Sequence, residues 1–224
     1  MSSTVRHAAV IAAICAICAL PLPALALDSG GDAPNAGGAS WSFRVLLDGK
    51  PIGQHQFRAT DGAGERTLVS EAAFSVRLLG VTLYQYQHRA VERWRGDCLL
   101  ALSADTDDNG ERTRVSARAL GEQFEVTAPI PQTERGCVMS FAYWNPALRA
   151  QQRLLNSQTG RIESVRVNAI GEGTLTVGKR MVSVSGWRIS GAAQPIDVWY
   201  SSQGDWLGLD TLVDGGRTLS YRRL

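Results

Sequence analysis

Two histidines and a glutamate, His55, His88 and Glu71, are the side chains best suited to chemistry in this sequence. Two imidazoles and a carboxylate on neighbouring strands form a set that binds transition metals, and the same groups serve as general acids and bases. The sequence predicts a strand around each residue, so this chemistry depends on the three strands being adjacent. The same predicted face also carries Tyr84, Tyr86, Glu92 and Trp94.

Three interpretations of this polar row are open. It could be a core network in which each buried polar group has a hydrogen-bond partner. It could be the polar floor of an apolar cavity, where a few polar groups fix the head group of a ligand. It could also be a catalytic or metal site.

Of these interpretations, we predict the ligand site and assign no catalytic residue, metal or cofactor. Its floor would be His55, Glu71 and His88, with Glu92 on the same face and Tyr84, Tyr86 and Trp94 along the wall. A paired carboxylate would raise the pKa of a neighbouring histidine, so we expect ligand affinity to change between about pH 5 and 8.

The elements that must position these residues are strands. From Trp41 onward, apolar and polar residues mostly alternate with a period of two, which is typical of half-buried strands. Turn signals separate the alternating segments, and they lie at Asp48-Gly49, 61–64, Leu79-Gly80, Gly96-Asp97, 108–110 and Gly121-Glu122. This spacing predicts antiparallel strands that follow one another as a meander.

Each turn also predicts a register. A two-residue turn at Leu79-Gly80 places Glu71 opposite His88, and a three-residue loop at 48–50 places His55 opposite Phe43. The later turns place Leu102 opposite Val115 and Ala117 opposite Val126. The apolar set gathered on one face is Leu100, Leu102, Ala104, Val115, Ala117, Phe124 and Val126. The arginines on the opposite face of 111–119 belong in water.

The predicted fold is therefore mainly β, a single long curved antiparallel sheet rolled toward a barrel. One helix is predicted over about 145–156. Asn145 and Pro146 are typical of a helix N-cap followed by a first-turn proline, and the residues after them favour a helix.

Residues 1–26 have the three parts of a secretory signal peptide. Arg6 and His7 give a basic start, an apolar run covers 8–20, and Ala24-Leu25-Ala26 supplies a cleavage site. Residues 27–39 are predicted to be a disordered lead, and 40–224 a single antiparallel β domain. We expect an exported, periplasmic protein with no transmembrane segment in its mature chain.

Cysteine usage agrees with export. Cys15 and Cys18 leave with the signal peptide, while Cys98 and Cys137 remain. Because an even pair in an oxidising compartment usually bonds, we predict a disulfide between Cys98 and Cys137.

Composition and motifs exclude several classes of protein. The chain has 23 basic and 21 acidic side chains, a near balance that argues against a nucleic-acid partner. It contains no P-loop, no Gly-x-Gly-x-x-Gly run and no Gly-x-Ser-x-Gly elbow.

Several stretches resemble an uncharacterised family of exported proteobacterial proteins. They are 47–53, 84–88, 92–94, 136–146, 154–160 and 197–201, and the run Phe141-Ala-Tyr-Trp-Asn-Pro146 is the most specific. The order of strands, one helix and more strands is also loosely similar to half-barrel lipid and lipoprotein carriers of the cell envelope. The family resemblance implies no established reaction, cofactor or catalytic residue.

Together these observations predict an exported protein that binds an apolar or amphipathic small molecule, such as a lipid, inside a curved sheet. One alternative is an envelope enzyme that uses the His/Glu groups for acid–base or metal chemistry. Another is a structural or interaction protein with a filled core. The sequence indicates no particular protein partner.

Overall fold

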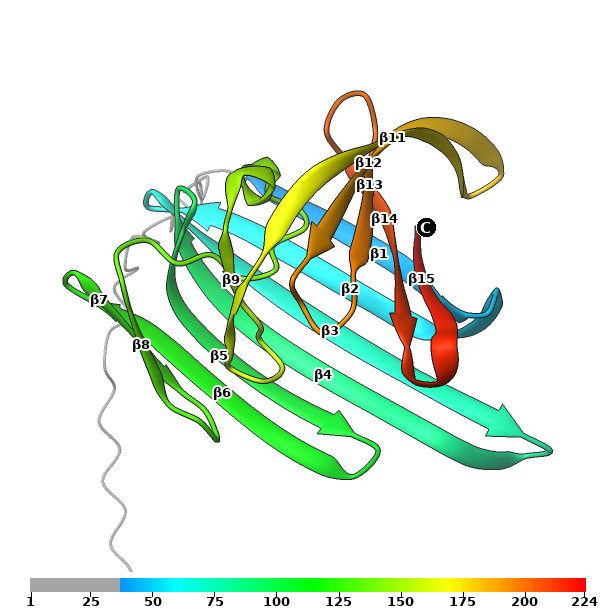
Figure 1. Ribbon diagram of the computed structural model, residues 1–224, viewed down its shortest axis with the longest axis horizontal. Coiled ribbons are helices and arrows are strands. Elements are labelled where there is room, and N and C mark those ends of the chain that lie inside the picture. Colours follow the sequence, from blue (N-terminus) through cyan, green and yellow to red (C-terminus); the bar gives the residue numbers. More distant parts are fainter. Residues whose placement is uncertain (1–36) are drawn as a thin grey trace, which may run out of the picture. The chain divides into compact units, whose positions relative to one another are not determined.

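The computed structural model describes residues 37–224, and most of them belong to strands (Figure 1). The first eight strands are β1 (Gly38–Leu47), β2 (Lys50–Gly62), β3 (Glu65–Leu78), β4 (Val81–Arg95), β5 (Cys98–Asp108), β6 (Glu111–Leu120), β7 (Gln123–Thr127) and β8 (Gln132–Arg135). The others are β9 (Arg153–Leu155), β10 (Ile162–Ser164), β11 (Arg166–Val177), β12 (Arg180–Ser190), β13 (Ile196–Tyr200), β14 (Trp206–Val213) and β15 (Arg217–Arg223).

Thirteen of these strands form one antiparallel sheet, in the order β11-β12-β13-β14-β15-β1-β2-β3-β4-β5-β6-β7-β8. Every neighbour follows in sequence except at one place, where the last strand, β15, pairs with the first, β1. The two outermost strands, β8 and β11, do not pair with each other, so the sheet does not close. The prediction of one large antiparallel sheet is confirmed.

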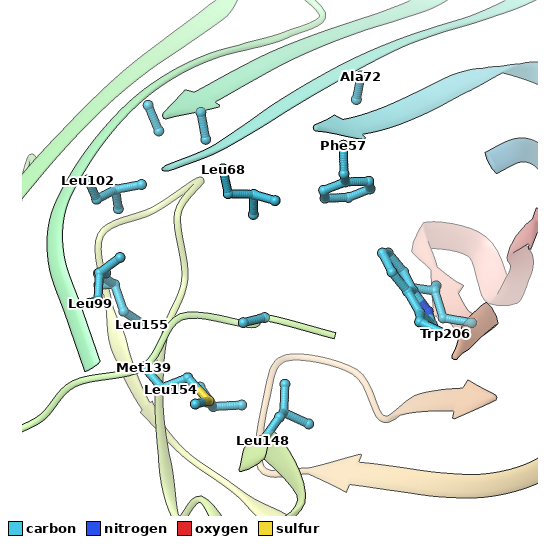
Figure 2. Close-up of a cluster of buried hydrophobic side chains, with 14 of the residues drawn as sticks. Phe57, Leu68, Ala72, Leu99, Leu102, Met139, Leu148, Leu154, Leu155 and Trp206 are labelled. Carbon is cyan, nitrogen blue, oxygen red and sulfur yellow. The ribbon is translucent and has the colours of Figure 1, made fainter. Parts of the chain in front are cut away.

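The segment 136–165 lies between β8 and β11 in sequence and packs against the inner face of the sheet. Figure 2 shows its side chains Met139, Leu148, Leu154 and Leu155 facing sheet residues such as Leu99 and Leu102. These four side chains are almost completely buried. Burial of each contributes about 1.5–3 kcal/mol, which is how a sheet with one apolar face obtains a core.

The disulfide attaches this segment to the sheet. Cys98 and Cys137 are bonded, with 5.0 Å between their Cα atoms, as the sequence predicted. The backbone N–H of Leu99 also donates to the carbonyl of Val138 at 2.9 Å. The start of β5 is therefore held against the segment by both a covalent bond and a hydrogen bond.

The predicted helix over 145–156 is wrong in type and length, since only a 3₁₀ turn forms over Pro146–Ala150. The capping signal is real, because the Asn145 side chain accepts a hydrogen bond from the N–H of Ala147 at 2.9 Å. The chain is extended from Gln151 onward, and β9 pairs with β10 in a separate two-stranded sheet.

Tertiary contacts explain the early end of the turn. The N–H of Leu155 donates to the carbonyl of Met139 at 2.8 Å, and the N–H of Val165 donates to Gln152 at 2.8 Å. These bonds replace the ones a helix would have made. Leu154 and Leu155 point to opposite faces of the extended chain, and both are completely buried.

The predicted faces of β5–β7 are correct, with one exception. Ala117 pairs with Val126, and Ala119 with Phe124, as expected. Leu102 pairs with Ala117 rather than Val115, a two-residue difference that keeps the same face.

The exception is Leu100, which is half-buried, while its neighbour Leu99 is fully buried. The register shifts between Arg93 and Trp94 on β4, which leaves Leu100 as the extra residue of β5. Leu99, opposite Trp94, therefore takes the inward place that we had given to Leu100.

The predicted signal peptide, 1–26, lies outside the described residues, as does most of the predicted lead, 27–39. The last two residues of that lead, Gly38 and Ala39, already belong to β1, where they pair with Thr60 and Ala59. Among residues 37–224, no helix is long and apolar enough to cross a membrane.

Candidate functional site

A hollow of about 300 Å³ lies between the inner face of β2–β4 and residues 140–144. Its sheet side is largely apolar, but it includes three ionisable side chains, His55, His88 and Glu92. Alternation along β2 and β4 points these side chains inward, together with Phe57 and Ala90. The predicted inward orientation of these three side chains is therefore correct, and they form part of the cavity wall.

The two histidines lie side by side across β3. His55 pairs with Ala72, which pairs with His88, and the ring centroids are 6.5 Å apart. The predicted pairing of His55 with Phe43 is also confirmed, but the predicted three-residue loop at 48–50 is wrong. The turn is Asp48-Gly49, and a register shift between Val45 and Leu46 supplies the extra residue.

Each imidazole has a hydroxyl partner. Nε2 of His55 lies 2.6 Å from Oγ of Ser70, and Nδ1 lies 3.4 Å from the hydroxyl of Tyr221. Nδ1 of His88 lies 2.9 Å from Oγ1 of Thr106. The histidines thus belong to two neighbouring hydrogen-bonded groups, one built from β2, β3 and β15 and the other from β4 and β5.

Both histidines are neutral at neutral pH. Burial lowers the pKa of His55 to about 3, with a smaller contribution from the neighbouring His88. Burial also lowers the pKa of His88 to about 4. The expectation that a paired carboxylate raises a histidine pKa is wrong, because burial dominates at both rings and outweighs the opposing effect of Asp105 on His88.

The expected carboxylate, Glu71, is on the opposite face. It pairs with Arg89 rather than His88, and its oxygens accept from Arg58 at 2.7 Å and from Arg89 at 3.3 Å. The register shifts between Val76 and Arg77. Val76 pairs with Tyr84 and Arg77 with Thr82, so β4 has one extra residue at this point.

A one-residue shift reverses the face of every side chain beyond it. The predicted row of two histidines and Glu71 is therefore not assembled. Within residues 37–224, no group of three or more His, Cys, Asp or Glu side chains could hold a metal ion.

Glu92 is the inward carboxyl group of this site. It is buried, accepts a hydrogen bond from Nε1 of Trp94 at 3.0 Å, and is also hydrogen-bonded by Ser140. Burial raises the pKa of Glu92 to about 7, despite the opposing effect of both hydrogen bonds. The group therefore exchanges between its acid and carboxylate forms near neutral pH.

The other predicted wall residues occupy different places. Trp94 is completely buried behind Glu92, with its ring 5.4 Å from that of Trp144. Tyr84 and Tyr86 line a second hollow of about 610 Å³, together with Phe74, Leu83 and Tyr221 among others. Gln158 lines both hollows, so the two adjoin at the turn around this residue.

Sequence reasoning missed two residues of the site, one that lines the first hollow and one that contacts His55. Trp144 lines it, and its indole Nε1 is buried without a hydrogen-bond partner among the described residues. Tyr221, from the last strand, reaches His55, and burial raises the tyrosine pKa so that its hydroxyl stays protonated. The specific run 141–146 was the only sequence signal for Trp144, while nothing local indicated Tyr221.

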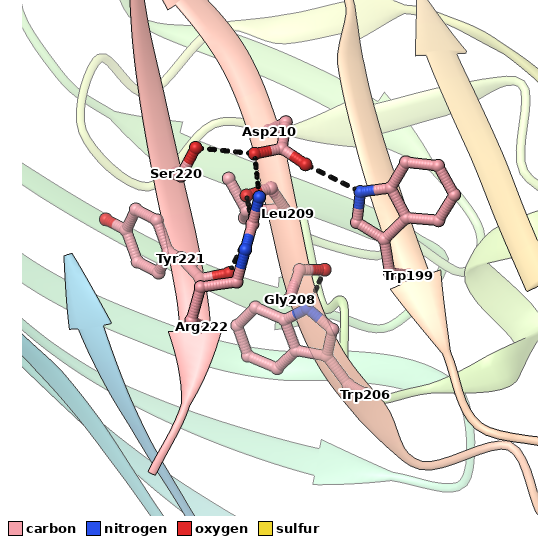
Figure 3. Close-up of polar contacts among 8 residues, drawn as sticks. All are labelled: Trp199, Trp206, Gly208, Leu209, Asp210, Ser220, Tyr221 and Arg222. Carbon is pink, nitrogen blue, oxygen red and sulfur yellow. Dashed lines mark hydrogen bonds and ion pairs between the residues drawn. The ribbon is translucent and has the colours of Figure 1, made fainter. Parts of the chain in front are cut away.

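Another polar cluster, shown in Figure 3, is fully paired. The carboxylate of Asp210 accepts from Nε1 of Trp199 at 2.8 Å, from Ser220 at 2.6 Å and from Arg222 at 2.7 Å. These bonds join β13, β14 and β15, so the cluster stabilises the sheet.

Comparisons with known proteins agree with this architecture. The chain is similar to a crystal structure of a β-barrel-like protein of domain of unknown function DUF1849 from Brucella abortus. The TM-score is 0.57 at 10% sequence identity, and the similarity covers 84% of this chain and 96% of the other. This likeness shows the fold alone.

A search of curated proteins finds no match. The family described as a domain of unknown function, DUF6134, matches residues 43–224. This range contains every strand from β2 to β15 and every residue of the site. The expectation of an uncharacterised family with a curved-sheet fold is confirmed, and the chain belongs to the DUF6134 family.

Proposed function

We propose that this protein binds an apolar or amphipathic small molecule, such as a lipid, in the hollow beneath β2–β4. The observation that carries the proposal is the buried indole N–H of Trp144, which has no acceptor among the described residues although the Trp144 side chain lines a hollow. A buried donor without a partner costs about 1–3 kcal/mol, and an oxygen atom of a ligand would remove that cost.

The two imidazoles of the wall suit a head group that is polar but uncharged. His55 and His88 are neutral above about pH 4, and neutral imidazoles both donate and accept hydrogen bonds. The adjoining hollow, lined by Phe74, Tyr86 and Tyr221, offers an aromatic surface to an apolar chain. Ligand sites of this size are mostly apolar with a few placed polar groups.

Native mass spectrometry of protein purified from its own envelope tests this function, because a retained lipid would appear directly as added mass. His88→Ala should reduce the retained fraction more than it lowers the melting temperature. Arg89→Ala is the matched control, since it is next on the same strand but faces outward. If His88→Ala is strongly destabilising and no ligand is found on the parent, the histidines form a core network instead.

Export is part of the proposal. The three-part N-terminus and the Cys98–Cys137 disulfide both support a periplasmic location. N-terminal sequencing of periplasmic material should begin at or near Leu27. A cytoplasmic protein that retains Met1 would overturn this location.

Acid–base catalysis at Glu92 is the second candidate function. Its pKa of about 7 suits a general acid or base at neutral pH, and Ser140 is within hydrogen-bond reach. Hydrolysis of chromogenic esters and glycosides by the parent, lost in Glu92→Gln, would favour this candidate over binding alone.

A further inference from the structure

The hairpin between β3 and β4 projects beyond the neighbouring strands (Figure 1). On one side, the pairing of β2 with β3 ends at Phe74, and on the other the pairing of β4 with β5 ends at Tyr86. The carbonyl of Gln85 still accepts from the N–H of Asn109 at 2.7 Å, so residues 75–84 form a two-stranded ribbon that no neighbouring strand pairs with.

The tip of this ribbon exposes large apolar side chains. Leu79 is 96% exposed, Val81 61% and Leu83 56%. The ten residues 78–87 include no charged side chain, whereas β4 beyond them carries Arg89, Arg93 and Arg95 in ion pairs. Charge is thus confined to the end of β4 away from the tip.

The residue at the turn itself is unusual. Leu79 has a φ of 49°, a conformation that leucine rarely adopts. Other hairpins of the sheet use Asp48-Gly49 and Asn109-Gly110 at the equivalent positions, which is the usual chemistry for such turns. A leucine at this place presents apolar surface to the outside at a conformational cost.

We propose that this tip, Leu79, Val81 and Leu83, docks on the surface of a phospholipid bilayer. Two amphipathic side chains flank the tip: Arg77 pairs with Thr82 beside it, and Tyr84, opposite Val76, lies further from the turn. Tyrosine rings favour the headgroup level, and arginine extends to lipid phosphates.

Dimensions also favour a bilayer over a protein partner. The stretch from Leu79 to Tyr84 spans about 15 Å at the rise of a strand, whereas interfacial segments enter the bilayer by about 5–10 Å. The charged rows of the sheet would thus stay in water. A stable protein interface buries about 800 Å² on each partner, with roughly 20–30 residues a side, which is more than this tip supplies.

The docking surface is independent of the proposed ligand, because vesicle binding needs nothing in the hollow. Leu83 and Tyr84 nevertheless line the second hollow as well, so the tip and the proposed site are adjacent. A failure of vesicle binding would leave the ligand proposal standing, and the reverse also holds.

Vesicle flotation tests the proposal with the full chain, so that the N-terminal segment is common to all proteins compared. The tip variant combines Leu79→Asn, Val81→Thr and Leu83→Thr, which keep turn and strand preferences. The control combines Ile130→Thr and Met181→Thr, at residues that are 62% and 74% exposed elsewhere. The probes are vesicles of phosphatidylethanolamine with phosphatidylglycerol, and vesicles of phosphatidylcholine alone.

We expect the tip variant to lose on the order of tenfold in vesicle partitioning, while the control binds like the parent. Brominated lipids should quench the tryptophan fluorescence of a Leu79→Trp variant more strongly than that of the parent. Equal partitioning of parent and tip variant overturns the proposal. So does a parent that self-associates without lipid, if the tip variant abolishes that association, because the tip would then be a protein interface.

Discussion

The ionisation of Glu92 should lower the free energy of unfolding as the pH rises, and Glu92→Gln should remove this dependence on pH. The carboxyl group is buried in contact with Trp94 and Ser140, and its pKa rises from 4.5 to about 7 on folding. A glutamine has nearly the same shape and can still accept from the indole and bond to the serine. The substitution therefore removes the titration and little else.

The size of the effect follows from the pKa difference. At about 1.4 kcal/mol for each pKa unit, the folded state is favoured by roughly 3 kcal/mol more at low pH than at high pH. A raised pKa means that this stability is fully present below about pH 4.5 and is lost as the pH rises through about 7. In Glu92→Gln, this loss does not occur.

Urea unfolding of both proteins, from about pH 4 to 9, measures the difference. The stability of Glu92→Gln relative to the parent should rise by about 3 kcal/mol across that range. Contributions from the histidines are the same in both proteins and cancel.

Glu65→Gln is a control of opposite sign, because Arg93 and Arg95 lower the pKa of that exposed carboxylate. Its stability relative to the parent should fall as the carboxylate ionises. A relative stability of Glu92→Gln that stays constant with pH would refute the buried, raised-pKa carboxyl group.

Three further outcomes are expected. Reduction of the disulfide, or replacement of Cys98 and Cys137 by serine, should cost about 4 kcal/mol in urea unfolding, given the separation of 39 residues; an unchanged midpoint would contradict this. Gly160→Ala should cost about 1–3 kcal/mol in thermal unfolding, because φ is +73° and the new Cβ would lie 2.3 Å from Ala128. Gly178→Ala, with a φ of +61° but no atom within 4 Å, should cost less. The pKa of His55 is lowered from 6.5 to about 3, so its contribution to stability is lost as the pH falls through that window. The free energy of unfolding of His55→Gln, measured in urea, should therefore decrease less steeply than that of the parent as the pH falls.

Much of the sheet could be predicted from local sequence. Alternation fixes which residues share a face, and short turns such as Gly121-Glu122 fix the register of the two strands they join. Ala117 pairs with Val126 for this reason. His55 reaches Phe43 differently, through a two-residue turn and a register shift at Val45/Leu46 that the turn signal did not indicate. The Cys98–Cys137 bond was also predictable, since only two cysteines remain after the predicted signal peptide.

The site was decided by tertiary structure. A single extra residue near Leu83 moved Glu71 to the outer face, and nothing in an alternating pattern marks where such a bulge will form. Residues 151–155 favour a helix locally but become extended, because backbone bonds to distant residues and the burial of Leu154 and Leu155 outweigh a weak propensity.

Contacts over long separations account for the remainder. Tyr221 reaches His55 only because β15 pairs with β1, and Trp144 reaches the hollow only because its segment packs across the sheet. Local patterns report the period and the turns of a strand, which involve neighbours in sequence. Which strands meet, and which side chain completes a cavity, depends on the free energy of packing the whole chain, so only the tertiary structure could determine it.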